Sequence, residues 1–162
     1  MALVDYFLKI DGVPGESQDA KHKDEIQVLS FSFGESQAGT MAFGGGGGAG
    51  KVQMQDFHFM MNVNKASPKL FLKCATGEHI KNAVLTARKA GKDQQDYLKV
   101  TFTDLLVSQF TTNGDANANS LPMDQISLNF AEIEIEYKQQ NADGSLGGAT
   151  KVKYNLKEMQ SK

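Results

Sequence analysis

Apolar and polar residues alternate along most of this 162-residue chain. A period of two is typical of β-strands that bury one face and expose the other. The alternation predicts strands at residues 6–10, 25–34, 52–63, 82–89, 97–110, 123–138 and 151–156. Strands therefore dominate the predicted secondary structure.

In three of these regions the apolar set changes phase by one residue. The change falls between Val28 and Leu29, again between residues 54 and 57, and again between residues 130 and 133. A straight strand would turn its apolar side chains outward there, so each slip predicts a bulge or bend. Residues 123–138 would also span about 50 Å if straight, too long for a flat strand in so short a chain. Because barrels turn their corners with bent strands, we predict a mainly β protein, an antiparallel β-barrel.

One helix interrupts the strands, and its sequence signals predict the bounds Ser67–Thr76. Ser67 suits the N-cap, Pro68 the first helical position and Gly77 the position after the last turn. Its apolar stripe, which we expect to plug or flank the barrel, consists of Leu70, Phe71 and Cys74.

Composition and charge narrow the class of protein further. The length fits a single domain over residues 1–162, and 17 basic against 19 acidic residues give a net charge of −2. This nearly neutral charge creates no electrostatic field that would attract nucleic acid, so we expect no nucleic-acid partner.

No apolar run approaches the ~20 residues needed to cross a bilayer, so we expect no membrane insertion. A basic segment followed by an apolar one is missing at the N-terminus, and Cys74 is the single cysteine. We therefore expect folding in the cytoplasm and any export without a cleaved signal peptide.

A glycine-rich loop at residues 37–50 carries no charge over fourteen residues. Residues 45–51 fit the phosphate-binding pattern G-x-x-x-x-G-K, but Val52 follows where that site needs Ser or Thr. An alternating strand also stands where the phosphate-binding helix should begin. A functional or flexible loop is therefore the favoured interpretation, with nucleotide binding as a remote alternative.

Candidate catalytic and metal-binding residues do not form recognisable constellations. Ser17 and Ser36 each lie one glycine short of a nucleophile elbow, and no predicted helix follows either of them. His22, His58 and His79 lack ligand spacing with one another or with Cys74. Three glutamates at positions 132, 134 and 136 alternate with isoleucines, as on the solvated face of a strand. We expect no enzyme activity, no metal and no cofactor.

Several motifs resemble the haemolysin-coregulated protein (Hcp) family, the tube proteins of bacterial type VI secretion systems. The longest are EIQVLSFSFG at residues 25–34, KASPKL at 65–70 and ISLNFA at 126–131. Shorter matches lie at residues 9–10, 15–17, 50–52, 56–57, 74, 77–79 and 88–91. Their order and spacing over the whole chain make the resemblance specific, although each piece alone is weak.

This resemblance implies a barrel with one helix, assembled into hexameric rings that stack into a tube. It also implies sheath and spike proteins as partners, small effector proteins carried in the lumen, and export of the tube protein from the bacterial cytoplasm. Alternation places Ser30 and Ser32 opposite a core face made by Leu29, Phe31 and Phe33. The family resemblance places that opposite face on the ring interior, so Ser32, and after it Ser30, are expected to contact cargo.

Ring stacking is expected to depend on the glycine-rich loop. Met41 and Phe43 have no place in the alternating pattern of the barrel, so burial against a neighbouring ring would stabilise a stack. The expected stacking residues are Thr40, Met41, Phe43, Gly44, Gly50 and Lys51. The alternative is that Met41 and Phe43 fold back onto their own barrel.

Two other classes of protein remain as alternatives. A secreted, non-catalytic binding module, such as a carbohydrate-binding β-sandwich, would need exposed aromatic residues, and the chain has no Trp and four Tyr. An enzyme with an unrecognised site would need an acid, base or nucleophile cluster in a pocket.

Overall fold

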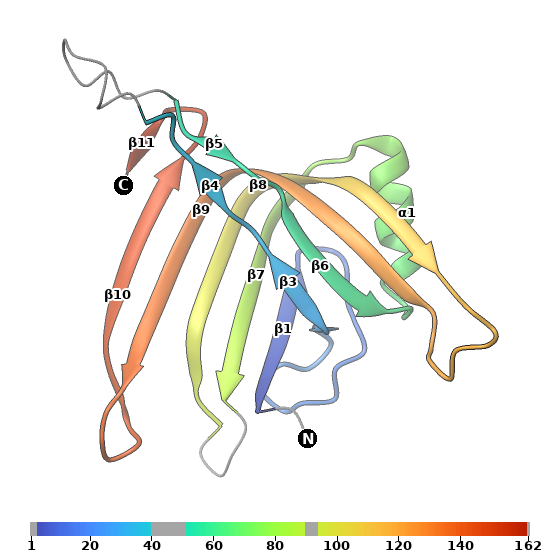
Figure 1. Cartoon of the computed structure of the whole chain (residues 1–162), viewed down its shortest axis with the longest axis horizontal. Helices are drawn as coiled ribbons and strands as arrows, with labels where there is room; N and C mark the ends of the chain where they lie inside the picture. The colour runs from blue at the N-terminus through green and yellow to red at the C-terminus, as the bar shows by residue number, and fades with distance from the viewer. Residues whose placement is uncertain (1–2, 40–50, 90–93, 162) are drawn as a thin grey trace.

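Strands form most of the structure, a computed structural model that describes residues 3–39, 51–89 and 94–161 (Figure 1). In chain order the elements are β1 (Val4–Ile10), β2 (Ile26–Val28), β3 (Ser30–Ser32), β4 (Glu35–Ser36), β5 (Gln53–Met54), β6 (Phe57–Asn62), α1 (Ser67–Thr76), β7 (Ile80–Lys89), β8 (Asp96–Asn113), β9 (Met123–Gln140), β10 (Leu146–Asn155) and β11 (Gln160–Ser161). All of the strand pairs are antiparallel. The predicted fold class is confirmed. None of the helices in the described ranges is long and apolar enough to cross a membrane.

The barrel closes through a strand that breaks in two. β2 pairs with β1, whereas β3, one residue further along, pairs with β6. β6 pairs with β9, and the order then runs through β8 and β7 back to β1. Leu29 sits at the break and donates its backbone N–H to the carbonyl of Met60 at 2.8 Å. The slip predicted near residue 28 is therefore the corner at which the barrel closes.

The two longest strands bend together. The first half of β9 pairs with β6 and its second half, from Glu132, pairs with β10. β9 changes its partner strand near residue 131. Opposite this position, Asp104 of β8 has a φ of 54°, in the left-handed region. The register of β8 against β9 is the same on both sides of Asp104 and shifts between Val107 and Gln109, where an extra residue of β8 forms a bulge that bends the pair. The bend predicted between residues 130 and 133 is confirmed, and β10 continues the sheet beyond the closed barrel (Figure 1).

Aromatic side chains fill the interior of the barrel. Phe102 lies at its centre, with ring centroids 4.7 Å from Phe57 and 4.8 Å from Phe130. Phe31 and Phe33 turn inward against this cluster as predicted. Leu29 does not: 50% of its surface is exposed, so its predicted place on the core face is wrong. Both Leu29 and Ser30 point outward because the chain changes partner strands at this corner.

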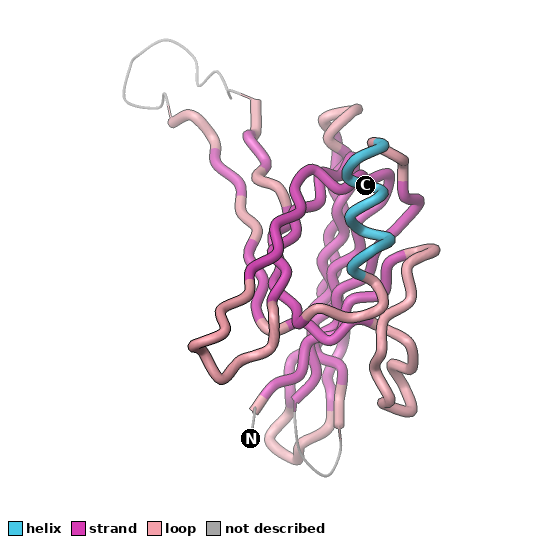
Figure 2. The backbone as a smooth tube through the Cα atoms, turned by 90° about the vertical axis from the view of Figure 1, so that its right-hand side faces the viewer, coloured by secondary structure: helices cyan, strands magenta, loops and turns pink. Residues whose placement is uncertain are grey.

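Helix α1 has the predicted bounds and lies along the outside of the barrel (Figure 2). Gly77 ends it in the left-handed region, φ 68°, and its N–H donates to the carbonyl of Lys73. Ser67 is not the N-cap, because its hydroxyl is turned inward and donates to Asp124 at 2.5 Å. Phe71, predicted on the packed stripe, is 60% exposed, and Leu70 is the helix's fully buried apolar residue. The helix flanks the sheet on one narrow side, so Phe71 lies at the edge of the contact, where its ring meets Phe110 edge-on.

Candidate functional site

A row of polar side chains crosses four neighbouring strands on the outer surface of the barrel. The pairing register aligns Ser32 of β3 with His58 of β6, Ser127 of β9 and Gln109 of β8. His58 Nδ1 lies 2.6 Å from the Ser127 hydroxyl, which lies 3.4 Å from Gln109 Oε1. Hydrogen bonds thus join β6, β9 and β8 across this surface, with Ser32 at its end.

A second row crosses the same four strands, two residues further along each of them. It consists of Ser30, Met60, Gln125 and Thr111. Both rows border a shallow hollow, whose lining residues include no Lys, Arg, Asp or Glu. We call this surface the neutral face and define it by Ser30, Ser32, His58, Met60, Gln109, Gln125 and Ser127. It offers hydrogen-bond donors and acceptors without a fixed charge.

Charges on the outer surface lie elsewhere. The second half of β9 carries Glu132, Glu134 and Glu136, which are half-buried and pair with lysines. The ion pairs are Lys153–Glu132 at 3.3 Å, Lys151–Glu134 at 3.3 Å and Lys138–Glu136 at 3.8 Å. These glutamates share one strand face, as the sequence predicted, but the lysines beside them cover part of it, so the face is less solvated than expected.

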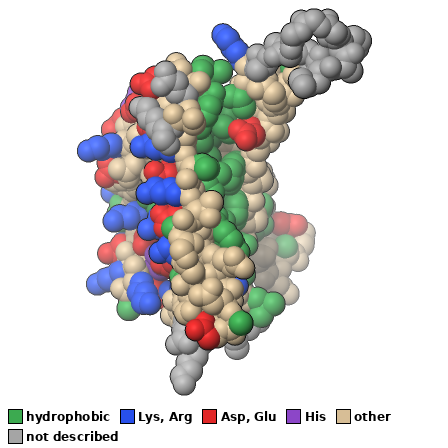
Figure 3. All heavy atoms as spheres, turned by 90° about the vertical axis from the view of Figure 1, so that its left-hand side faces the viewer, with side chains coloured by type: hydrophobic (Ala, Val, Ile, Leu, Met, Phe, Trp, Pro, Cys, Tyr) green, Lys and Arg blue, Asp and Glu red, His purple; other side chains and the backbone are tan. Residues whose placement is uncertain are grey.

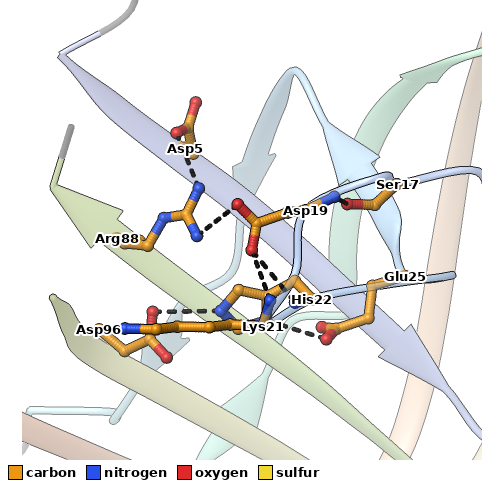
Figure 4. Close-up of polar contacts among 8 residues, drawn as sticks. All are labelled: Asp5, Ser17, Asp19, Lys21, His22, Glu25, Arg88 and Asp96. Atoms are coloured by element: carbon orange, nitrogen blue, oxygen red, sulfur yellow. Dashed lines mark hydrogen bonds and ion pairs between the residues drawn. The ribbon is translucent and has the colours of Figure 1, made fainter. Parts of the chain in front are cut away.

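A buried polar cluster ties the connection between β1 and β2 to the barrel (Figure 4). Arg88 of β7, only 3% exposed, pairs with Asp19 at 2.8 Å and with Asp5 at 3.4 Å. His22 stacks on the ring of Phe7, 4.5 Å between centroids. Its two ring nitrogens contact Glu25 at 2.8 Å and Asp96 at 3.2 Å. The sequence showed His22 as an isolated residue, because two of its partners, Phe7 and Asp96, come from β1 and β8.

Electrostatics within this cluster act most clearly on Asp19. Burial raises the pKa of its carboxyl, but the hydrogen bond and charge of Arg88 and the N–H groups of Lys21 and His22 lower it more. The net pKa of Asp19 lies below its ordinary value. The charged groups of the cluster are paired with one another, so the role of the cluster is to hold the β1–β2 connection against the barrel. Across the parts of the chain described, no three His, Cys, Asp or Glu side chains gather closely enough to hold a metal ion.

The geometry agrees with comparisons to known proteins. The family model described as "Type VI secretion system effector, Hcp" matches residues 7–137. Protein hcp1 of Pseudomonas aeruginosa is 44% identical over 157 residues, which cover 96% of each chain. The chain belongs to the Hcp family.

Solved structures of Hcp proteins share the fold. Hcp1 from Salmonella typhimurium is 35% identical with a TM-score of 0.83, over 99% of this chain and 100% of that one. A structure described as a type six secretion system protein is 28% identical with a TM-score of 0.92, over 98% of this chain and 99% of that one. A type VI secretion system effector from Yersinia pestis is 32% identical with a TM-score of 0.75, over 93% and 99%. The resemblance inferred from short motifs is therefore confirmed along the chain.

The residues expected to contact cargo in this Hcp chain lie on one surface. Ser30 and Ser32 are exposed and point away from Phe31, as alternation predicted, and both border the neutral face. His58, Gln109, Gln125 and Ser127 complete that face and were not predicted as site residues. Alternation alone places His58 outward, but only the pairing register brings β8 and β9 alongside.

The stacking residues expected in the Hcp loop are mostly beyond the described ranges. Thr40, Met41, Phe43, Gly44 and Gly50 lie outside the described residues, and Lys51 is exposed at the end of the loop. The roots of the loop are described, since β4 and β5 pair through Glu35–Met54 and Ser36–Gln53. The loop therefore leaves the barrel from a defined two-stranded base.

Proposed function

We propose that the chain is a single-domain subunit of the type VI secretion tube, which assembles into hexameric rings that stack and carry effector proteins. Membership of the Hcp family supports the secretion system, and one feature of the surface supports the ring. That feature is an apolar strip along the inner face of β10 and the second half of β9. Figure 3 shows apolar side chains running along this side of the molecule beside a charged surface.

The apolar strip continues the core outward and includes two side chains that a solitary subunit leaves largely uncovered. Val152 is 62% exposed and Tyr137 is 47% exposed. Val152 lines a hollow beyond the closed barrel with Phe33, Met54, Ile133, Ile135 and Tyr154, and Glu35 and Lys153 also border it. Tyr137 follows Ile135 on the same face of β9. We define the apolar strip by these seven apolar residues. Contiguous apolar surface of this kind is typical of protein–protein contacts.

Covering the apolar strip with a neighbouring subunit would favour a ring. Burying a side chain such as valine or tyrosine stabilises by about 1.5–3 kcal/mol. The opposite side of the molecule carries α1 and different residues, so a contact between the two sides joins unlike surfaces. Head-to-tail contacts of this type close into rings when the rotation between subunits permits. A stable contact would bury on the order of 1,000 Å² or more.

The neutral face suits the interior of such a ring. Six copies would present hydroxyl, amide and imidazole groups without lysine, arginine or carboxylate side chains in the hollow. A surface of this kind offers hydrogen bonds to many proteins without selecting them by charge. We propose that Ser32, and after it Ser30, contact the cargo there. The residues of the loop, from Thr40 to Lys51, would contact the next ring.

The remaining partners and the route of the protein follow from membership of the family. We propose that sheath and spike proteins contact the assembled tube, and that the subunit leaves the bacterial cytoplasm without a cleaved signal peptide. We propose no catalytic role, because the side chains of the neutral face contain no acid–base–nucleophile arrangement. The two ring nitrogens of His22 are occupied by contacts with Glu25 and Asp96.

Native mass, measured by size-exclusion chromatography with light scattering, tests the ring. The expected mass is six times the 17.6 kDa of the chain. Val152→Asp would place a charge in the centre of the apolar strip and is expected to give 17.6 kDa monomers that keep the wild-type circular dichroism spectrum. Lys151→Asp, on the other face of the same strand, serves as the control and should remain hexameric. A wild-type monomer at micromolar concentration would overturn the proposal.

A further inference from the structure

A buried histidine lies where the β1–β2 connection, residues 11–25, meets the barrel (Figure 4). His22 is 6% exposed, and its ring stacks face to face on the ring of Phe7 with an interplanar angle of 8°. Its Nδ1 lies 2.8 Å from a Glu25 oxygen, and its Nε2 lies 3.2 Å from an Asp96 oxygen. Both nitrogens of one imidazole therefore face carboxylates, one from the connection itself and one from the first residue of β8.

These two contacts decide how many protons the ring needs. A carboxylate only accepts hydrogen bonds, and a neutral imidazole carries one N–H and one lone pair. In either neutral tautomer, a lone pair of His22 would face a carboxylate oxygen, at 2.8 Å or at 3.2 Å. The imidazolium instead donates to Glu25 and to Asp96 at once. The hydrogen bonds of this site are thus complete only when the ring carries both protons.

Charges on the neighbouring elements bear on the second proton. Asp19 of the connection accepts the backbone N–H of His22 at 3.2 Å. Arg88 of β7 lies over the same Phe7 ring, and its positive charge opposes a second one nearby. It is engaged, however, by Asp19 at 2.8 Å and by Asp5 of β1 at 3.4 Å. The carboxylates that share these two cationic side chains are Asp5, Asp19, Glu25 and Asp96. The other charged side chains of the connection are exposed: Asp11, Glu16, Lys21, Lys23 and Asp24. The excess of carboxylates favours the imidazolium.

Backbone hydrogen bonds fold the connection into a two-armed unit. The N–H of Gly15 donates to the carbonyl of Asp24 at 2.7 Å, and the N–H of Ser17 donates to the carbonyl of Glu25 at 3.0 Å. A Cβ at Gly15 would lie 2.5 Å from that carbonyl oxygen of Glu25, so the two arms approach as closely as glycine allows. A two-armed unit of this size is marginally stable in water on its own, so it depends on its attachment to the barrel.

Side chains provide part of that attachment. Asp19 reaches Arg88 of β7, and His22 reaches Asp96 of β8. Arginine keeps its proton across the whole range in which proteins fold, whereas histidine changes charge near neutral pH. The link to β8 is therefore the one that can change with pH.

We propose that His22 is a proton-dependent link, which fastens the β1–β2 connection to β8 as an imidazolium and releases it as a neutral ring. Folding gives the imidazolium two acceptors, so its stabilising effect is complete in mildly acidic solution and is lost as the pH rises and the ring gives up its proton. In stronger acid the effect is lost again, because Glu25 and Asp96 take up protons of their own. The release is local, since the pairing of β6, β8 and β9 does not involve this proton. The inference concerns the subunit itself and goes beyond the proposed function.

Hydrogen exchange followed by mass spectrometry tests the local release. Protection of residues 11–25 is the exchange rate of the unfolded chain divided by the observed rate at the same pH, so the intrinsic pH dependence of exchange cancels. Between pH of about 6 and about 9, we expect protection to fall about tenfold in the wild type, as for the loss of one hydrogen bond to a charged group. Protection of β9 should stay constant.

Two histidine variants separate this link from a general effect of pH. His22→Gln should show low protection of residues 11–25 already at pH of about 6, with no further fall toward alkaline pH. His79→Gln, at an exposed histidine, is the control and should follow the wild type. Wild-type protection that does not change with pH, or an equal fall in H22Q, would overturn the proposal.

The protons of the ring can also be observed in the wild-type protein, which keeps the proposal testable if H22Q does not fold. In protein labelled with ¹⁵N on histidine, the chemical shifts of the ring nitrogens distinguish an imidazolium from either neutral tautomer. The chain has three histidines, so H79Q and His58→Gln assign the signals by removing the other two. We expect His22 to lose one ring proton over the same pH interval in which residues 11–25 lose protection. A ring that is neutral throughout, or a proton lost without a change in protection, would overturn the proposal.

Discussion

Among single residues, Arg88 illustrates how this barrel tolerates a buried charge. Its guanidinium lies 4.8 Å over the ring of Phe7 and pairs with two carboxylates from the N-terminal region. Removing an ion from water costs several kcal/mol, which such pairing can offset. The partners come from β1 and from the connection after it, so one side chain of β7 fixes both. The same turn is held by two further hydrogen bonds: the backbone N–H of Asp19 donates to the Ser17 hydroxyl, and the N–H of Lys21 donates to the Asp19 carboxylate.

Asp19→Asn is expected to change how stability depends on pH. The folded-state pKa of Asp19 is below its unfolded value of about 3.8, so its stabilising effect is complete above that pH. The effect is lost as the pH falls below 3.8 through the folded-state pKa. D19N should therefore lower the free energy of unfolding by about 2 kcal/mol at pH 7, and the difference from wild type should shrink in acid.

Urea denaturation at several pH values measures this difference. Asp11→Asn, at an exposed position in the same connection, provides the control and should leave the free energy of unfolding within about 0.5 kcal/mol. A D19N variant with an unchanged acid profile would show that Asp5 alone holds Arg88.

At the scale of elements, α1 shows what sequence signals fix and what they leave open. Pro68 and Gly77 predicted both ends of the helix, because each acts through its own backbone. The role of Ser67 was wrong because its hydroxyl bonds Asp124, 57 positions away in the sequence. The exposure of Phe71 likewise depends on how the helix sits against β8, where it makes an edge contact with Phe110 at 5.8 Å. The ends of the helix could therefore be predicted from the sequence, whereas the tertiary contacts of Ser67 and Phe71 could not.

The strands follow the same division. Alternation predicted the inward side chains of β6, β8 and β9 and the outward place of Ser32, because the period of a strand is a local property. It could not align β3, β6, β9 and β8, since pairing partners depend on chain topology. The neutral face exists only through that alignment, so Ser30 and Ser32 were predicted and His58, Gln109 and Ser127 were missed.

Ser67→Ala should destabilise the junction between α1 and β9. Ser67 donates to Asp124 Oδ2 and accepts the N–H of Asn64 at 3.0 Å. Asp124 is fully buried, and its other oxygen has no partner among the described residues. Leaving this carboxyl without its hydroxyl partner is expected to cost about 1–3 kcal/mol in urea denaturation. Thr76→Ala, an exposed hydroxyl on the last turn, should stay within about 0.5 kcal/mol; equal losses would contradict the role of the buried bond.

For the whole molecule, two surfaces with different chemistry have separate proposed roles. The apolar strip would join subunits within a ring, and the neutral face would line the channel. They share no residue. Substitutions in one surface should therefore leave the role of the other intact, and each role can be tested alone.

Ser32→Arg is expected to reduce cargo retention while the ring persists. Ser32 is exposed, so the arginine needs no space in the core, but six copies would place six cations around a neutral channel. The measurement is co-purification of an effector with tagged rings, with native mass as the check on assembly. Ser145→Arg, exposed in the β9–β10 turn, is the matched control. Undiminished retention by S32R would show that this face does not contact cargo.

The order in which β10 joins the barrel has a consequence for synthesis. β1 pairs with β7, and β6 pairs with β9, so the barrel can close only after residues up to 128 have left the ribosome. At roughly 5–20 residues per second, the nascent N-terminal strands stay without their distant partners for roughly 6–24 s. β10, with Val152 at the centre of the apolar strip, leaves the ribosome after that. The subunit contact surface of the proposed ring is therefore completed last. Unfinished chains on neighbouring ribosomes would then not associate through it before their barrels have closed.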